Sequence, residues 1–86
     1  MSAEATSGSA LFDALVIATG IDRMVAPFMV RRLLMRVGVF RVETLKPDDI
    51  ERVRPHLQTE LTKYFDASEL PLAMRRIDAL RPKPRA

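Results

Sequence analysis

Residues 22–38 read DRMVAPFMVRRLLMRVG, a stretch that is apolar around almost the whole circumference of a helix and yet carries arginines. At about 3.6 residues per turn, one side of this helix collects only apolar residues. They are Ala26, Val30, Leu33, Leu34 and Val37. A surface helix normally has a polar opposite face, but here that face mixes arginine with methionine and phenylalanine. Its residues are Met24, Phe28, Arg31, Arg32, Met35 and Arg36. We therefore expect another helix of the chain, or a partner, to cover it.

The ends of this helix are marked by Asp22, which can cap a first turn, and by Gly38, which suits the position after a helix. Pro27 complicates the start, because proline in a helix interior costs about 3 kcal/mol and is tolerated only in the first turn. We expect a first turn over residues 22–25 that continues, distorted, into the main helix. The whole helix then covers about residues 22–37.

A shorter helix is predicted upstream, over about residues 10–18. Ser9 is its expected N-cap, and Asp13 lies in its opening turn, where a carboxylate suits the helix dipole. Gly20 can take the left-handed conformation that often follows a helix. Residues 1–9 are mainly small and polar and offer little to bury, so we expect them to form a disordered leader.

The segment after the central helix reads VFRVETL over residues 39–45 and is strand-like in its branched and aromatic side chains. The chain offers no second strand to take up its hydrogen bonds. We therefore expect an extended connector, held to the core by Val39, Phe40 and Val42. A strand formed with a second copy of the chain is the alternative.

A third helix is predicted over residues 47–65. Pro47 suits the first helical position, and Asp48 and Asp49 suit the positive end of a helix. Apolar residues follow at three- and four-residue spacing. They are Ile50, Val53, Leu57, Leu61, Tyr64 and Phe65. Pro55 interrupts this pattern, so we expect a kink or a break next to it.

A capping-box pattern runs from Asp66 to Glu69 and predicts a last helix over residues 68–80. The tail, residues 81–86, is basic and rich in proline, and we expect it to be unstructured. Four helical segments with short connections predict an all-α fold, a single small four-helix bundle over residues 10–80 with proline-distorted helices.

The composition is that of an ordinary globular chain of 86 residues, 48% apolar and 29% charged, with a net charge of +3. So mild a charge permits an anionic partner without requiring one. The sequence contains no cysteine, no apolar run of membrane-spanning length and no secretory signal at its start. We expect a cytoplasmic protein.

No catalytic motif is recognisable, and we expect neither an enzyme nor a cofactor. His56 is the only histidine and is expected on the surface, because one histidine without cysteine makes a poor metal site. Asp48, Asp49 and Glu51 form an acidic cluster, but the helix dipole alone accounts for acids at a helix start. We therefore expect no metal.

The aromatic residues Phe12, Phe40 and Phe65 are expected in the core, whereas Phe28 lies among arginines. Methionine either fills irregular cores or lines adaptable binding grooves. For Met24, Met29 and Met35 the sequence leaves both roles open.

The functional prediction is a non-catalytic protein–protein interaction module, a small adaptor or regulatory subunit. It would bind a protein partner or itself through the face that carries Met24, Phe28, Arg31, Arg32, Met35 and Arg36.

The alternative is a nucleic-acid-binding regulator. A second basic group comprises Arg75, Arg76, Arg81, Lys83 and Arg85, and residues 18–39 have the outline of a helix–turn–helix. The candidate recognition helix, however, offers arginine but none of the Asn, Gln, Ser or Thr that commonly read base edges. A peripheral membrane contact through the basic apolar helix ranks last.

Overall fold

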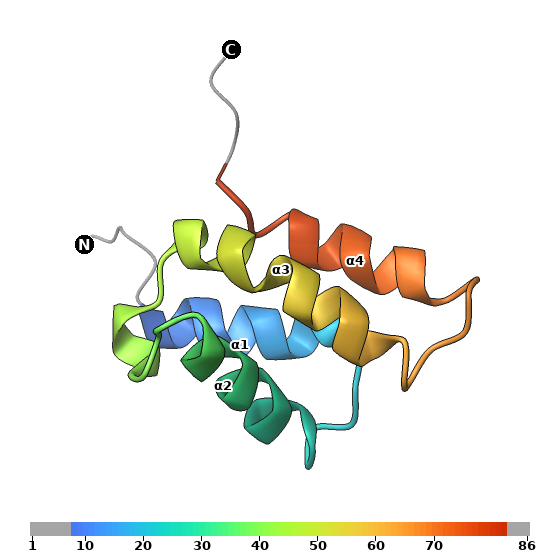
Figure 1. The fold of residues 1–86 in the computed structure, drawn as a ribbon, viewed down its shortest axis with the longest axis horizontal. Helices are drawn as coiled ribbons and strands as arrows, with labels where there is room; N and C mark the ends of the chain where they lie inside the picture. The colour runs from blue at the N-terminus through green and yellow to red at the C-terminus, as the bar shows by residue number, and fades with distance from the viewer. Residues whose placement is uncertain (1–7, 83–86) are drawn as a thin grey trace.

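The computed structural model describes residues 8–82 and confirms the all-α bundle (Figure 1). Its elements are α1 (Gly8–Thr19), α2 (Ala26–Arg36), the 3-10 helix η1 (Val42–Thr44), α3 (Pro47–Leu61) and α4 (Leu70–Asp78). No strand forms within these residues, and the connector that was expected to be extended contains η1. Residues 1–7, which hold most of the expected leader, and residues 83–86 lie outside the described part.

Helices α3 and α4 run side by side, and α1 packs against α4, η1 and α2 (Figure 1). The main contacts of α2 are with α1 and α3. This arrangement covers one side of α2, as its sequence predicted. The most deeply buried large side chains come from all four helices. They are Leu15, Val30, Leu33, Leu34, Ile50, Val53, Leu57, Leu61 and Ile77.

The start of α2 resolves the placement of its proline. The N–H of Ala26 donates to the carbonyl oxygen of Asp22 at 2.8 Å, and Asp22 Oδ1 accepts from the N–H of Met24 at 2.7 Å. The expected turn over residues 22–25 is therefore present, and regular helix begins only at Ala26. Pro27 falls in the first turn of α2, where its missing N–H costs no helical hydrogen bond.

Both glycine-terminated helices end as predicted, with Gly20 at φ 73° and Gly38 at φ 90°. Each end is also held by an arginine from another helix. Arg76 Nε donates to the carbonyl oxygen of Ala18 at 3.0 Å, and Arg52 donates to the carbonyl oxygen of Val37. A positive charge at a helix C-terminus is favourable to the dipole, so these two arginines stabilise α1 and α2.

The start of α1 differs from the prediction. The helix begins at Gly8, so Ser9 lies inside it and is not its N-cap, and Asp13 lies beyond the opening turn. Gly8 is buried against η1, where a Cβ atom would overlap the carbonyl oxygens of Val42 and Glu43. Only glycine allows the two backbones to approach so closely.

Helix α3 is continuous through Pro55, with no break, and it ends at Leu61 rather than residue 65. Pro55 and Glu51 are both exposed, so water can satisfy the Glu51 carbonyl that the proline leaves without a donor. Beyond the helix, Phe65 is half-buried against the core, but Tyr64 is exposed.

Helix α4 is preceded by the predicted capping box. Asp66 Oδ1 accepts from the N–H groups of Ser68 and Glu69, both at 2.9 Å, and Glu69 Oε1 accepts from the N–H of Asp66 at 3.4 Å. The Ser68 hydroxyl also donates to Asp66 Oδ1, and this hydrogen bond is the main cause of the lowered pKa of Asp66, followed by those from the N–H groups of Glu69 and Ser68. Regular helix starts at Leu70, two residues later than expected, because residues 67–69 form a turn.

The connector is held by Val39 and Leu45, both buried, with Val42 partly buried. Phe40 is 72% exposed, so its assignment to the core was wrong. Neighbouring residues of an extended segment point to opposite sides. Because Val39 faces the core, Phe40 faces away from it.

Candidate functional site

The face of α2 opposite the core, together with the turn before it, is called here the α2 outer face. It comprises Met24, Phe28, Arg31, Arg32, Met35 and Arg36. Its apolar side chains are exposed: Met24 by 79%, Phe28 by 77% and Met35 by 46%. Met29, in contrast, is buried in the core. The methionines of this helix therefore divide between core filling and an uncovered surface.

A groove between α1 and α2 adjoins this face and has a volume of about 410 Å³. It is lined by Phe12, Asp13, Val16, Ile17, Arg23 and Pro27. Ile17 is 65% exposed, and no pattern in the sequence had singled it out. Arg31 of the outer face lies over Phe12, which lines the groove, so the α1–α2 groove and the outer face adjoin.

The arginines of this surface have few acidic partners. Arg31 lies over the ring of Phe12, with its guanidinium carbon 5.9 Å from the ring centroid, so it covers part of the groove. Arg32 Nη2 lies 3.3 Å from Glu60 Oε2 on α3. Arg23 and Arg36 are exposed and make no ion pair with any residue from 8 to 82. One arginine of the predicted site is therefore paired, and the cationic rim is otherwise uncompensated.

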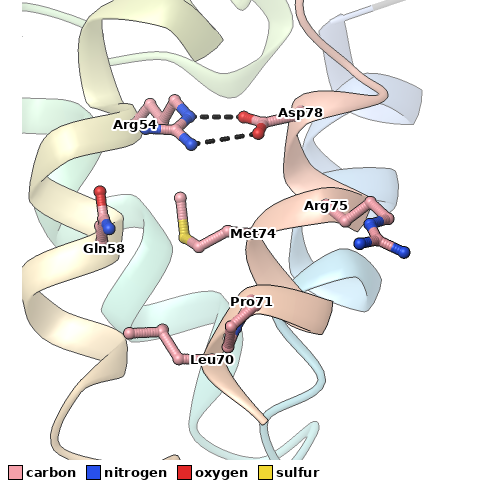
Figure 2. A pocket seen from close by; sticks show the side chains of 7 residues that line it. All are labelled: Arg54, Gln58, Leu70, Pro71, Met74, Arg75 and Asp78. Carbon is pink, nitrogen blue, oxygen red and sulfur yellow. Dashed lines mark hydrogen bonds and ion pairs between the residues drawn. The ribbon is translucent and has the colours of Figure 1, made fainter. Parts of the chain in front are cut away.

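The second basic group does not come together as one surface within the described residues. Arg76 binds the end of α1, and Arg81 pairs with Glu51, Nη2 to Oε1, at 2.7 Å. Arg75 is exposed on α4 and points away from α3 (Figure 2). Lys83 and Arg85 lie outside the described residues.

A second groove, about 350 Å³ in volume, lies between α3 and α4 (Figure 2). Its lining is Arg54, Gln58, Leu70, Pro71, Met74, Arg75 and Asp78. Arg54 closes one end by binding both carboxylate oxygens of Asp78, with Nη2 3.1 Å from Oδ2. The hydrogen bond from Arg54 is the main cause of the lowered pKa of Asp78, and the Asp78 carboxylate in turn raises the pKa of Arg54. Two of the four polar residues in this groove, Arg54 and Asp78, thus satisfy each other.

Two of the three acidic residues at the start of α3, Asp49 and Glu51, are engaged in the fold. Asp49 Oδ2 accepts from the N–H of Lys46 at 3.0 Å, and Asp49 Oδ1 lies 3.4 Å from Arg52. Glu51 binds Arg81. His56 is partly exposed on α3, and no group of three metal-binding side chains comes together within residues 8–82. The carboxylates of Asp49 and Glu51 thus act in helix capping and ion pairing.

Comparison of the chain with protein-family models, curated proteins and solved structures found no match. Within residues 8–82, no helix combines the length and the hydrophobicity needed to cross a bilayer. Exposed apolar side chains are concentrated in one part of the described chain. Most of the large ones in the described chain belong to the surface of α1, α2 and the turn between them. They are Ile17, Met24, Val25, Phe28 and Met35.

Proposed function

We propose that this protein is a non-catalytic protein–protein interaction module that binds its partner through the α2 outer face and the α1–α2 groove. The observation that carries the proposal is the 77% exposure of Phe28 beside Met24, on a helix whose other side is fully buried. Large apolar side chains gathered on one face commonly mark an interaction site. Methionine, aromatic residues and arginine are also the residue types enriched in protein interfaces.

Nucleic-acid binding is the second candidate, and the exposed arginines Arg23, Arg31 and Arg36 favour it. Two arrangements count against it. Other arginines, such as Arg76 and Arg81, bind groups of the same chain and are therefore not available to bind phosphate. The free arginines also alternate with apolar side chains, whereas contacts to phosphate need a groove or stripe of positive charge.

The deciding variant is Phe28→Glu combined with Met35→Glu, which places two carboxylates in the apolar part of the outer face. Both positions are exposed, so we expect the helical circular-dichroism signal and the melting temperature to stay close to those of the parent. We expect the proteins retained by the parent in a pull-down from native lysate to be lost, because a buried unpaired charge is strongly unfavourable in an interface.

The matched control is Phe40→Glu combined with Leu72→Glu. These two apolar side chains are also exposed but lie outside the proposed surface, and the change in net charge is the same. This control should retain the partner. Equal binding by both double variants would show that the interface lies elsewhere. Unfolding of the Phe28→Glu, Met35→Glu variant would show that the outer face is part of the core.

Nuclease treatment and salt separate the two candidate functions. Phosphate contacts make affinity fall steeply with salt concentration, whereas burial of apolar surface does not. Retention that survives nuclease and about 0.5 M salt supports a protein partner. Retention that disappears under both conditions supports the nucleic-acid alternative.

A further inference from the structure

We infer that the ligand of this surface is an acidic amphipathic helix supplied by a different protein. This inference rests on the proposed function and specifies its partner. Three properties of the surface lead to it: its shape, its uncompensated positive charge and its poor match to a second copy of itself.

The shape of the surface fits a helix. Phe28 and Met35 lie seven positions apart along α2, a length of about 10 Å at 1.5 Å per residue, and Met24 adds a further apolar side chain from the turn before the helix. That spacing of about two turns matches a bound helix, which presents apolar side chains at i, i+3 or i+4, and i+7. The adjoining α1–α2 groove can receive a large apolar side chain against Phe12 and Ile17.

The charge of the rim selects acidic residues. Arg23 lies at the groove end of the surface, and Arg36 lies at the end of α2. Neither arginine has an acidic partner among residues 8–82. Arg31 contacts the ring of Phe12 and no carboxylate of the described residues. Arginine binds carboxylates with paired hydrogen bonds, so a ligand helix with Asp or Glu beside its apolar stripe would match this rim.

A second copy of the chain is a poor match to the same surface. A two-fold dimer brings the same patch of both subunits together, so the surplus of arginines over acidic residues in the patch is doubled. The nearby acids are Asp13 and Asp22, and the side chain of Asp22 already accepts from the N–H of Met24. Like charges facing each other are strongly unfavourable in an interface. The partner is therefore a different, acidic chain.

The test uses two synthetic helical peptides, each about fourteen residues long. Both carry Leu at i, i+3 and i+7, and their flanking positions are all Glu in one and all Lys in the other. Binding to the full chain is measured by fluorescence anisotropy. We expect the Glu peptide to bind at least about tenfold more tightly than the Lys peptide, with a preference that shrinks as salt is added.

Charge-reversal variants locate the effect. Arg36→Glu and Arg23→Glu should each weaken the Glu peptide about fivefold and strengthen the Lys peptide. Arg75→Glu changes the net charge equally, but on an exposed part of α4 distant in sequence from the surface, and should alter neither affinity by more than about twofold. Phe28→Glu should abolish binding of the Glu peptide.

Several outcomes would overturn the inference. If the two peptides bind equally or not at all, the ligand is not an acidic helix. The same conclusion follows if Arg75→Glu and Arg36→Glu have equal effects. A dimeric mass in light scattering that Phe28→Glu returns to the monomer assigns the surface to a second copy. Binding to phosphatidylglycerol vesicles that Phe28→Glu abolishes, without peptide binding, assigns it to a membrane.

Failure of this inference and failure of the proposed function remain distinguishable. If the parent retains proteins that Phe28→Glu with Met35→Glu loses, while the peptides show no preference, the interaction module stands and the acidic helix falls. If the lysate experiment shows no difference from the matched control, the proposed function falls as well.

Discussion

Helices α3 and α4 are joined by arginines that find acidic partners, whereas the α2 outer face carries arginines that mostly do not. Arg54 binds Asp78, and Arg81 bridges Asp78 and Glu51, so these four charges balance one another. On α2, Arg36 has no ion pair within the described residues and lies close in sequence to the exposed Met35. The same residue type thus stabilises the fold in one region and remains available for binding in the other.

The largest difference in stability is expected between variants on the inner and the outer side of α2. Leu33 is buried on its inner side, and Leu33→Ala should reduce the free energy of unfolding by about 2 to 5 kcal/mol, because it leaves a cavity in a small core. Phe28→Ala on the outer side should change it by less than about 0.5 kcal/mol. Urea denaturation followed by circular dichroism measures both. Similar losses in the two variants would mean that the outer face is packed.

A smaller effect is expected at the α3–α4 contact. Asp78→Asn at pH 7 should lower the stability by about 1 to 2 kcal/mol, because it removes the charge that holds Arg54 and Arg81 at a partly exposed site. Thermal melts at pH 7 measure the loss. Asp13→Asn is a suitable control, since Asp13 lies beyond the opening turn of α1, is exposed and makes no ion pair with the described residues.

The pH dependence sharpens the same prediction. The pKa of Asp78 is lowered in the folded state, mainly by the hydrogen bond from Arg54. The contribution of Asp78 to the stability of the fold is therefore complete above the ordinary aspartate pKa of about 3.9, and it is lost as the pH falls through the lower pKa of the folded state. The difference in melting temperature between parent and Asp78→Asn should therefore be constant near neutral pH and shrink below about pH 4. A difference that grows on acidification would contradict this assignment.

The smallest effect is expected for the unpaired arginines. Arg36→Ala should leave the free energy of unfolding within about 0.5 kcal/mol of the parent, since no ion pair with the described residues is lost. Arg76→Ala should cost more, because Arg76 donates to the C-terminal end of α1. If the order of these two variants were reversed in urea denaturation, the distinction between fold-stabilising and available arginines would fail.

Much of the fold was predictable because the signals are local. The buried stripe of α2, the proline at the start of α3 and the capping box at Asp66 each follow from residues within one or two turns. Gly20 and Gly38 were assigned correctly because a positive φ after a helix is a property of the glycine itself. Helical phase placed Met24, Phe28 and Met35 opposite the core stripe, but their exposure was left open by the sequence and is seen only in the structure.

The sequence by itself determined the buried stripe of each helix, because burial within a helix follows its period. Only the tertiary structure decided which arginine meets which partner, since Arg76 reaches Ala18 from a position 58 residues away. It alone decided that Gly8 lies against η1 and that Phe12 and Ile17 line a groove with Pro27. These features depend on how separate helices pack, a relation that no spacing within a single segment encodes.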